Sequence, residues 1–382
     1  MKIEITSLCY HTIKVKKIVL LWSITLISTI LVWLPFFSQG KMDRVFANYD
    51  GPNYIVVAKC WYSKECIRKN FSLPLPLEYY PAHFPGYPAL IALLDQFLPG
   101  WWAMMIANCL GVLAMITVFY QLLKDLKLPS PLWLSLIILF LPARMLVLHS
   151  VGAPETWFIA TLLFSILMYR RKKYFWSGIS LALAQSIKTP AVLLLLALCI
   201  NLLINEYNKE NNLRRLMVKI VAKGWPLVFP VLVVLLIFFL YLKQTGDFWA
   251  YFHSGDNFHL VFPPLQAFIS SRSWLGDFWL EDIIYIYLIG GLAILYLLKK
   301  YPKDIVAIFP LVFYLATLFV AHRDISRYSA PLYPFWIIAF ANLLKKKEFK
   351  TVFFLLLPAI YLYTINFITY NTAPIADWTP YY

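Results

Sequence analysis

The chain has 382 residues, of which 61% are hydrophobic and 14% are charged, and its mean hydropathy is +0.68. A soluble domain of this length needs far more polar surface, so the composition excludes a soluble globular protein and indicates a chain that a bilayer surrounds. The formal net charge is +15, but the basic residues gather in alternate loops, which argues against nucleic-acid binding and for a membrane topology.

Eleven apolar segments are candidates for crossing about 30 Å of hydrocarbon, which takes about 20 helical residues each. In chain order they are 18–37, 100–123, 131–148, 153–169, 174–187, 189–205, 225–242, 283–298, 304–321, 328–344 and 351–369. The first is too long for a cleaved signal peptide and lacks a cleavage site. We therefore expect an all-α, polytopic membrane domain over residues 1–382, with no separate soluble unit.

The charges between these segments predict how the chain is oriented. If the N-terminus is cytoplasmic, the inner loops hold 22 of the 34 Lys and Arg but only 6 of the 19 Asp and Glu. This distribution follows the positive-inside rule. It predicts an integral, multi-pass protein whose C-terminus and long loops are extracytoplasmic. The short inner loops favour a prokaryotic cell membrane over the endoplasmic reticulum.

Two of the predicted outer loops are long, 38–99 and 243–282. They contain short apolar segments rich in aromatic residues, which are 53–62, 87–98 and 262–274. Such segments are typical of amphipathic helices that lie in the membrane interface. Between the first two, residues 72–88 include five prolines, which favour a stiff, extended path. That path is either a linker or one wall of a cleft.

Asp50, in the sequence NYDGPNY (48–54), is the first candidate for chemistry. With Gly51 and Pro52 after it, this carboxylate lies in a turn, where an aspartate often bonds only its own backbone. Asp43, seven residues earlier, is a competing acid that also suits a plain solvated charge. The residues alone leave both interpretations of Asp50 open.

Three further candidates lie where predicted spans reach the outer side. Glu155 follows Pro154 at the start of a span, where helix capping is a sufficient explanation. His149, close by, has no such explanation. Lys188 precedes another predicted helix start, against the preference of the helix dipole, and this points to an anionic partner such as a phosphate.

Another predicted junction on the outer side is AHRDISRYSAPLYP (321–334), which contains His322, Arg323, Asp324 and Arg327. Arg323 fits a snorkelling arginine at a membrane boundary. Arg327, just inside the start of a span, is better explained as a ligand of a buried phosphate or carboxylate.

Cysteine spacing and short motifs are less informative. Cys60 and Cys66 share one outer loop and form either a disulfide or two free thiols. No CxxC or His/Cys metal spacing occurs, and no GxGxxG, Walker A, HExxH, Ser-elbow or EF-hand pattern occurs in its required context. We therefore expect neither a metal ion nor a cofactor, and no nucleotide-dependent soluble active site.

One loop carboxylate beside several cations suits the transfer of a sugar from a lipid-phosphate donor. The leaving polyprenyl phosphate is anionic and needs cations, whereas the acceptor hydroxyl needs a general base. A glycosidase would instead need two carboxylates, one of them protonated. A single in-line displacement with one base inverts the anomeric centre.

The chain resembles the GT-C membrane glycosyltransferases, and is closest to their GPI-mannosyltransferase branch of the PIG-V type and its prokaryotic relatives. Six short motifs carry the resemblance, in order along residues 43–340: Tyr49-Asp50-Gly51-Pro52-Asn53-Tyr54 with Ile55 to Ala58, His83-Phe84-Pro85-Gly86-Tyr87-Pro88, Gly152-Ala153-Pro154-Glu155-Thr156, Lys188-Thr189-Pro190, Thr245-Gly246-Asp247-Phe248 and Arg327-Tyr328. Three positions depart from the family pattern: Tyr49 replaces a Trp, Gly86 a bulky apolar residue, and Lys188 an Arg.

This resemblance implies a GT-C fold and a polyprenyl- or dolichyl-phosphate sugar donor, most simply a mannose donor, with Asp50 as the catalytic base. Lys188, Arg327 and His322 would bind the donor phosphate. Residues expected to contact the substrates are Tyr54, His83, Tyr87, His149, Glu155 and Asp247. The acceptor would be an extracytoplasmic lipid, glycan or protein.

Two other classes of function fit the same sequence. A membrane transporter or lipid flippase would place ionisable residues near the bilayer midplane on broken helices, often with inverted repeats. A non-catalytic subunit of a glycosylation complex would tolerate the loss of Asp50.

Overall fold

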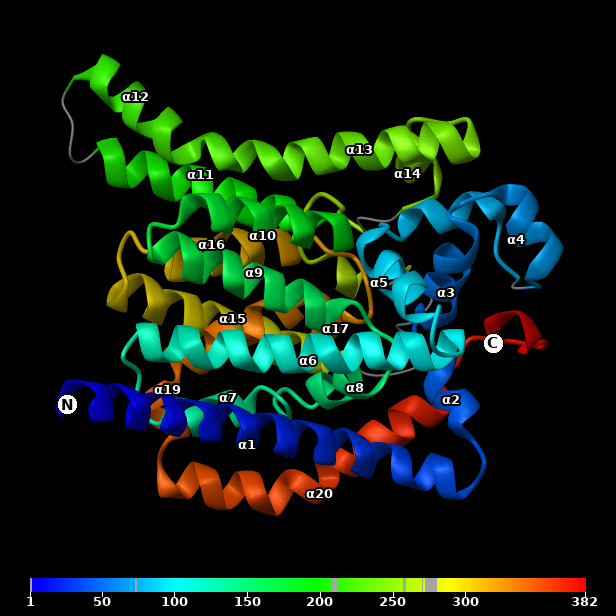
Figure 1. The fold of residues 1–382 in the computed structure, drawn as a ribbon, viewed down its shortest axis with the longest axis horizontal. Helices are drawn as coiled ribbons and strands as arrows, with labels where there is room; N and C mark the ends of the chain where they lie inside the picture. The colour runs from blue at the N-terminus through cyan, green and yellow to red at the C-terminus, as the bar shows by residue number, and fades with distance from the viewer. Residues whose placement is uncertain (1, 73, 208–211, 257–258, 270, 272–279) are drawn as a thin grey trace.

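The computed structural model describes residues 2–72, 74–207, 212–256, 259–269, 271 and 280–382. Every regular element among these residues is a helix, and most of the helices run roughly side by side in one bundle (Figure 1). The extended pairings in the described part are two isolated β-bridges, Asn48–Thr372 and Leu260–Val320. The prediction of an all-α chain is therefore confirmed for these residues.

Five helical segments are long and apolar enough to cross a membrane. They are Val15–Ser38 within α1 (Lys2–Ser38), α6 (Gly100–Asp125), Leu213–Thr245, α15 (Glu281–Lys300) and α20 (Lys347–Tyr370). The third joins α12 (Leu213–Gly224), η2 (Trp225–Leu227) and α13 (Val228–Thr245). A sixth results if α8 (Arg144–Ser150) and α9 (Glu155–Arg170), bent by 106° at their junction, form one broken span. The chain is thus a membrane-embedded helical protein, whereas its eleven spans and the GT-C fold stay predictions.

The remaining predicted spans correspond to shorter or interrupted helices. Shorter ones are α10 (Tyr174–Ile187), α11 (Ala191–Tyr207) and α16 (Ile305–Thr317). The predicted span 131–148 is divided into α7 (Pro131–Ile137) and α8. The predicted span 328–344 begins at the end of α17 (Ile325–Tyr328) and is then divided into η5 (Ala330–Leu332), α18 (Tyr333–Ala339) and α19 (Ala341–Leu344). Single uninterrupted helices were the wrong expectation for these two segments. Pro142 lies within the first break, where it lacks the N–H that would continue a helix.

The connecting segments divide between the two ends of the bundle. Helices α2 (Met42–Phe46), α3 (Gly51–Cys60), α4 (Lys64–Asn70), α5 (Gly86–Leu94) and α14 (Ala250–His253) gather at one end with the C-terminus, whereas the N-terminus and α12 lie at the other (Figure 1). The described residues of the two long loops, 38–99 and 243–282, thus share one end of the molecule.

The first long loop folds into the protein rather than onto a membrane surface. Every residue of α3 except Lys59 is buried, and Ile55, Val56 and Val57 are at most 1% exposed. The expectation of an interfacial helix at 53–62 is therefore wrong, because the apolar side chains pack against α5 and α6 instead of lipid. Segment 87–98 keeps exposed apolar residues such as Phe97. Of segment 262–274, residues 270 and 272–274 lie outside the described residues.

The proline-rich stretch 72–88 is more regular than its composition predicts. Its middle forms the 3₁₀ helix η1 (Leu77–Ala82), and its end enters α5. Pro88 lies in the first turn of α5, where a missing N–H costs no helical hydrogen bond. The remaining short helices are η3 (Gln266–Phe268) and η6 (Thr379–Tyr381).

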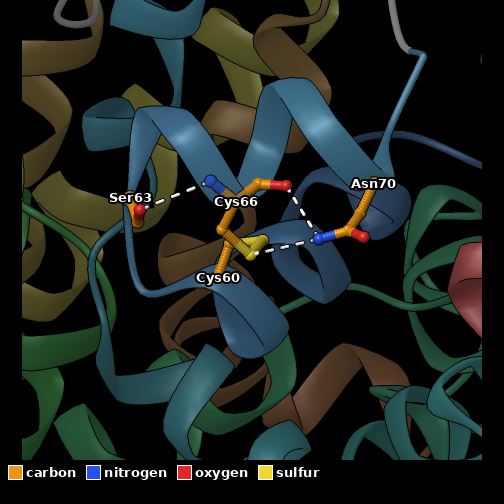
Figure 2. Close-up of a disulfide and its surroundings, with 4 residues drawn as sticks. All are labelled: Cys60, Ser63, Cys66 and Asn70. Carbon is orange, nitrogen blue, oxygen red and sulfur yellow. Dashed lines mark hydrogen bonds between the residues drawn. A yellow bond between two sulfur atoms is a disulfide. The ribbon is translucent and has the colours of Figure 1, made fainter.

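A disulfide joins two neighbouring helices of this loop. Figure 2 shows Cys60, the last residue of α3, bonded to Cys66 of α4, with the two Cα atoms 5.5 Å apart. The Asn70 side-chain amide donates a hydrogen bond to the backbone carbonyl of Cys66 over 2.9 Å, and the Ser63 hydroxyl caps α4 (Figure 2). Of the two alternatives that the sequence left open, the structure has the bonded pair.

Candidate functional site

A cavity of about 170 Å³ lies where the first long loop meets the ends of several helices. Its walls come from the start of α3, the η1–α5 connection, the start of α9, the α10–α11 turn and α17. Predicted site residues that line it are Asp50, Tyr54, His83, Glu155, Lys188 and Arg327. Six predicted residues from five separate parts of the sequence thus face one small cavity.

Asp50 is the N-cap residue of α3, yet its carboxylate makes no capping hydrogen bond. Instead, its Oδ2 accepts a hydrogen bond from Nη2 of Arg327 over 3.0 Å. The interpretation of Asp50 as an ordinary turn residue that bonds its own backbone is therefore wrong. Burial opposes ionisation of Asp50, but the charge and hydrogen bond of Arg327 outweigh it and hold the pKa of Asp50 below its ordinary value.

Arg327 joins the two carboxylates of the cavity. Its Nε donates to Oε1 of Glu155 over 2.7 Å while its Nη2 contacts Asp50, and its guanidinium carbon lies 4.2 Å from the centroid of the Tyr49 ring. The side chain of Arg327 is 16% exposed. A planar guanidinium suits this position because its fixed fork reaches two partners at once while one face stacks on an aromatic ring.

Glu155 is the second carboxylate, and it binds two cations through one oxygen. Oε1 accepts from Nζ of Lys188 over 2.6 Å as well as from Arg327, and the Glu155 side chain is only 3% exposed. Oε2 is buried without a hydrogen-bond partner in the described part of the chain. Helix capping alone is therefore an insufficient explanation of Glu155, although the residue does begin α9.

Lys188 occupies the turn between α10 and α11. It is the C-cap residue of α10, where a cation suits the helix dipole, and it also lies shortly before the start of α11, as predicted. In the structure Lys188 pairs with the carboxylate of Glu155, and its binding of a phosphate stays a prediction. The Lys188 side chain is 27% exposed, so it is the more accessible of the two cations.

His83 and Tyr54 form the aromatic side of the cavity. The His83 ring lies 4.9 Å from the Tyr54 ring, edge to face, and its Nδ1 is buried with no hydrogen-bond partner among the described residues. Burial lowers the pKa of His83 below its usual range, despite the nearby Asp50 carboxylate. A neutral imidazole at pH 7 therefore faces the same space as two cations and two carboxylates.

Three other predicted site residues lie away from the cavity. Tyr87 packs behind Tyr54, with the ring centroids 5.2 Å apart, and its hydroxyl donates to the Met104 carbonyl. His149 is fully buried, and neither ring nitrogen has a partner in the described residues. Asp247 pairs with His253 over 2.6 Å at the surface. These positions favour structural roles for Tyr87 and Asp247.

His322 lies directly behind the cavity wall. Its ring lies 4.9 Å from that of His259 and 5.0 Å from that of Tyr328, two residues that do line the cavity. Its Nδ1 accepts a hydrogen bond from the Asp324 backbone N–H over 2.9 Å. Burial, with the neighbouring His259, lowers the pKa of His322 to about 4. At pH 7 this ring is therefore neutral rather than positively charged.

Arg144 is a charged residue of this region that the sequence analysis missed. Its guanidinium pairs with Asp324 over 3.2 Å, donates to the Tyr49 hydroxyl over 3.1 Å and stacks on Phe367. Through Tyr49 it supports the face on which Arg327 stacks. A signal was present, because an arginine inside an apolar segment is usually functional or paired.

No protein-family model matches this chain, and no curated protein matches it either. The site therefore has to be interpreted from its own chemistry.

The cavity combines a proton acceptor, an anion-binding pair and aromatic surface. Asp50 is ionised and is available to accept a proton, and Lys188 with Arg327 can stabilise an anionic oxygen. Aromatic faces such as Tyr54 suit an apolar or sugar ring. No group of three His, Cys, Asp or Glu side chains among the described residues is arranged to hold a metal ion, and metal independence stays a prediction.

Proposed function

We propose that this protein is an inverting glycosyltransferase that moves a sugar, most simply mannose, from a polyprenyl- or dolichyl-phosphate donor to an extracytoplasmic acceptor. The observation that carries the proposal is the convergence of Asp50, Lys188 and Arg327 on one cavity. The carboxylate of Asp50 can accept a proton from one group, and the two cations can stabilise another group that leaves as a phosphate.

The proposed reaction is a single displacement at the anomeric carbon. The acceptor hydroxyl oxygen forms the new glycosidic bond while the bond from the anomeric carbon to the phosphate oxygen breaks. The leaving polyprenyl phosphate keeps the electron pair, and its added charge is stabilised by Lys188 and Arg327. The hydroxyl proton passes to the carboxylate of Asp50. No protonating acid is required, because a phosphate is a good leaving group once its charge is neutralised.

The contacts of the two carboxylates support transfer over glycoside hydrolysis. A glycosidase needs one carboxylic acid that stays protonated, which usually calls for an apolar environment. Here Arg327 touches both Asp50 and Glu155, and Lys188 touches Glu155 as well. Cations in direct contact favour the ionised form of each carboxylate. Glu155 would instead hold the two cations in place and offset their charge until the donor phosphate binds.

The proposal also agrees with the GT-C resemblance. Five of the six motifs that carry it contribute at least one residue to the cavity wall. These residues are Asp50 and Tyr54, His83 and Phe84, Glu155, Lys188 to Pro190, and Arg327 with Tyr328. The TGDF motif lies elsewhere, since Asp247 is at the surface with His253. The sugar, the acceptor and the prokaryotic extracytoplasmic setting belong to the proposal.

The decisive experiment compares wild-type protein with Asp50→Asn in nanodiscs, using radiolabelled polyprenyl-phosphate mannose. Asparagine keeps the shape of the side chain and removes the base. We expect donor turnover in the wild type and a loss of about 10²- to 10⁴-fold in the variant, the usual contribution of a general base, with donor binding retained. The matched control is Asp43→Asn, an exposed acid in the same loop, which should keep full turnover. Equal turnover in wild type and Asp50→Asn would remove Asp50 from the mechanism.

A transporter or lipid flippase is the second candidate, and one observation favours it. The α8–α9 pair is bent by 106° next to Glu155, and broken helices at a buried charge network are typical of transporters. Flux of a labelled polyprenyl-phosphate sugar across proteoliposomes, in the absence of any transfer product, would support this function. A non-catalytic subunit would show neither activity, and its stability would depend on a partner protein.

A further inference from the structure

A second polar cavity has a volume of about 690 Å³, and the helix ends that form it lie on the α12 side of the bundle, opposite α3 (Figure 1). The α9–α10 turn, the α15–α16 turn and the facing ends of α11 and α12 form its walls. Its charged lining residues are Arg170, Lys172, Glu206, Lys223, Lys303 and Asp304. Four cations thus face two carboxylates, so the lining carries an excess of two positive charges.

The excess charge resides on two lysines of the turns. Arg170 is occupied by Asp125, over 3.1 Å, and by Asp304, and Lys223 is occupied by Glu206 over 2.7 Å. By contrast, Lys172 and Lys303 have no ion-pair partner in the part of the chain that the structure describes, and both are exposed. These two ammonium groups are therefore available to an anionic ligand.

Hydrogen bonds hold one of these turns in position. The Asn201 side-chain amide donates to the Lys303 carbonyl over 2.8 Å, and that of Asn205 donates to the same oxygen over 3.2 Å and to Asn201 over 2.8 Å. Asn201 is buried. These hydrogen bonds fix the backbone of the α15–α16 turn, while the ammonium group of Lys303 has no ion-pair partner among the described residues.

Helix α12 indicates the class of ligand. Leu213, Met217 and Val221 on this helix are 53–73% exposed, and Arg214 and Arg215 add charge beside them. Trp225 follows at the junction with α13 and is 51% exposed. In Figure 1, α12 lies at the outer edge of the bundle and leads into α13. A basic amphipathic helix next to a span, with a tryptophan at the boundary, is typical of a helix that lies in the membrane interface.

We propose that this cavity binds the phosphate headgroup of an anionic phospholipid, with α12, the basic end of the Leu213–Thr245 segment, beside it at the depth of the membrane interface. The apolar face of α12 would bury itself among the acyl chains, and Lys172 and Lys303 would contact the headgroup phosphate. Basic pockets between membrane helices at the positively charged side are suited to anionic headgroups. This site is independent of the Asp50 cavity and of the reaction proposed for it.

Native mass spectrometry of the purified full-length protein tests the proposal, with phosphatidylglycerol and phosphatidylcholine as the two probes. The test variant is Lys172→Gln/Lys303→Gln. The matched control is Lys345→Gln/Lys346→Gln, which removes two exposed lysines from another loop of the chain, α19–α20, that does not line the cavity. A cation near an anionic lipid surface contributes about fivefold in affinity, so the test variant should bind phosphatidylglycerol about thirtyfold more weakly. The control variant should keep most of its affinity for phosphatidylglycerol.

Three results would overturn the proposal. They are equal binding of the two lipids by the wild type, equal losses in the two variants, and full displacement of phosphatidylglycerol by millimolar inorganic phosphate. The last result would assign the cavity to a soluble phosphate ligand. The single substitution Lys303→Gln, with an expected loss of about fivefold, replaces the double variant if the latter does not fold.

Discussion

Glu155 should contribute more to the stability of this protein than any exposed acid, because it is the shared counter-charge of two cations. The informative perturbation is Glu155→Gln. Glutamine keeps the volume and one acceptor oxygen but removes the charge that faces Lys188 and Arg327. Two positive groups would then face each other across a cavity with only Asp50 left to offset them.

The size of the effect follows from the burial of the three side chains. Exposed fractions are 3% for Glu155, 16% for Arg327 and 27% for Lys188. Removing one partner of a buried ion pair costs about 3–5 kcal/mol. We expect the lower end, about 3 kcal/mol, because glutamine still accepts a hydrogen bond and Lys188 can turn towards water. At about 2 °C per kcal/mol for a chain of this size, the melting temperature should fall by about 6 °C.

Thermal unfolding in detergent, followed by intrinsic tryptophan fluorescence, measures this change. The matched control is Glu78→Gln, the same substitution in the exposed pair of Glu78 with Lys64, whose side chains are 57% and 41% exposed. That pair should contribute less than about 1 kcal/mol. Adding Lys188→Gln to Glu155→Gln should cost less than the sum of the single changes, because the two residues interact directly. If Glu155→Gln melts at the same temperature as Glu78→Gln, the charge network does not stabilise the fold.

Two further predictions concern pH and packing. Because Arg327 holds the pKa of Asp50 below its ordinary value, the stabilisation from this pair is complete above about pH 4 and is lost as the pH falls through the lower folded-state pKa. The difference in melting temperature between wild type and Asp50→Asn should therefore stay constant from pH 7 to pH 5 and shrink only below about pH 4. A decrease that begins near pH 6 would show that the pKa of Asp50 is raised instead. In Gly86→Ala, the new Cβ would lie 2.7 Å from the carbonyl oxygen of Ser186 and would also clash with the Ser186 hydroxyl. Helix α5 must then move away from α10, at a cost of about 1–3 kcal/mol. An unchanged melting temperature would contradict this close contact.

The glycine at position 86 has a packing explanation in this structure. The α10 backbone at Ser186 occupies the space that a side chain at position 86 would need. A bulky residue at this position would require a different distance between α5 and α10. No signal along the sequence could predict this, because Gly86 and Ser186 are 100 positions apart.

Local features of the sequence determined that the chain is a membrane protein, and they identified the candidate residues of the site. Long apolar runs predicted a helical membrane protein, because a helix satisfies its own backbone hydrogen bonds wherever it is buried. Ionisable residues at the ends of those runs were few, so Asp50, Glu155, Lys188 and Arg327 could be identified individually. Short apolar segments were less informative: α3 packs in the protein core rather than on a membrane surface, and its composition suits either environment.

Only the tertiary structure decided which charges meet. Arg327 is 277 positions from Asp50 and 172 from Glu155, and Lys188 is 33 from Glu155. The tertiary structure also showed which predicted site residues lie away from the cavity, because Asp247 faces the surface and Tyr87 lies behind Tyr54. The pKa of a carboxylate depends on charges within a few ångströms and on the water around it. Both are set by how the helices pack together, so a sequence can name the titratable groups of a site but not their protonation states.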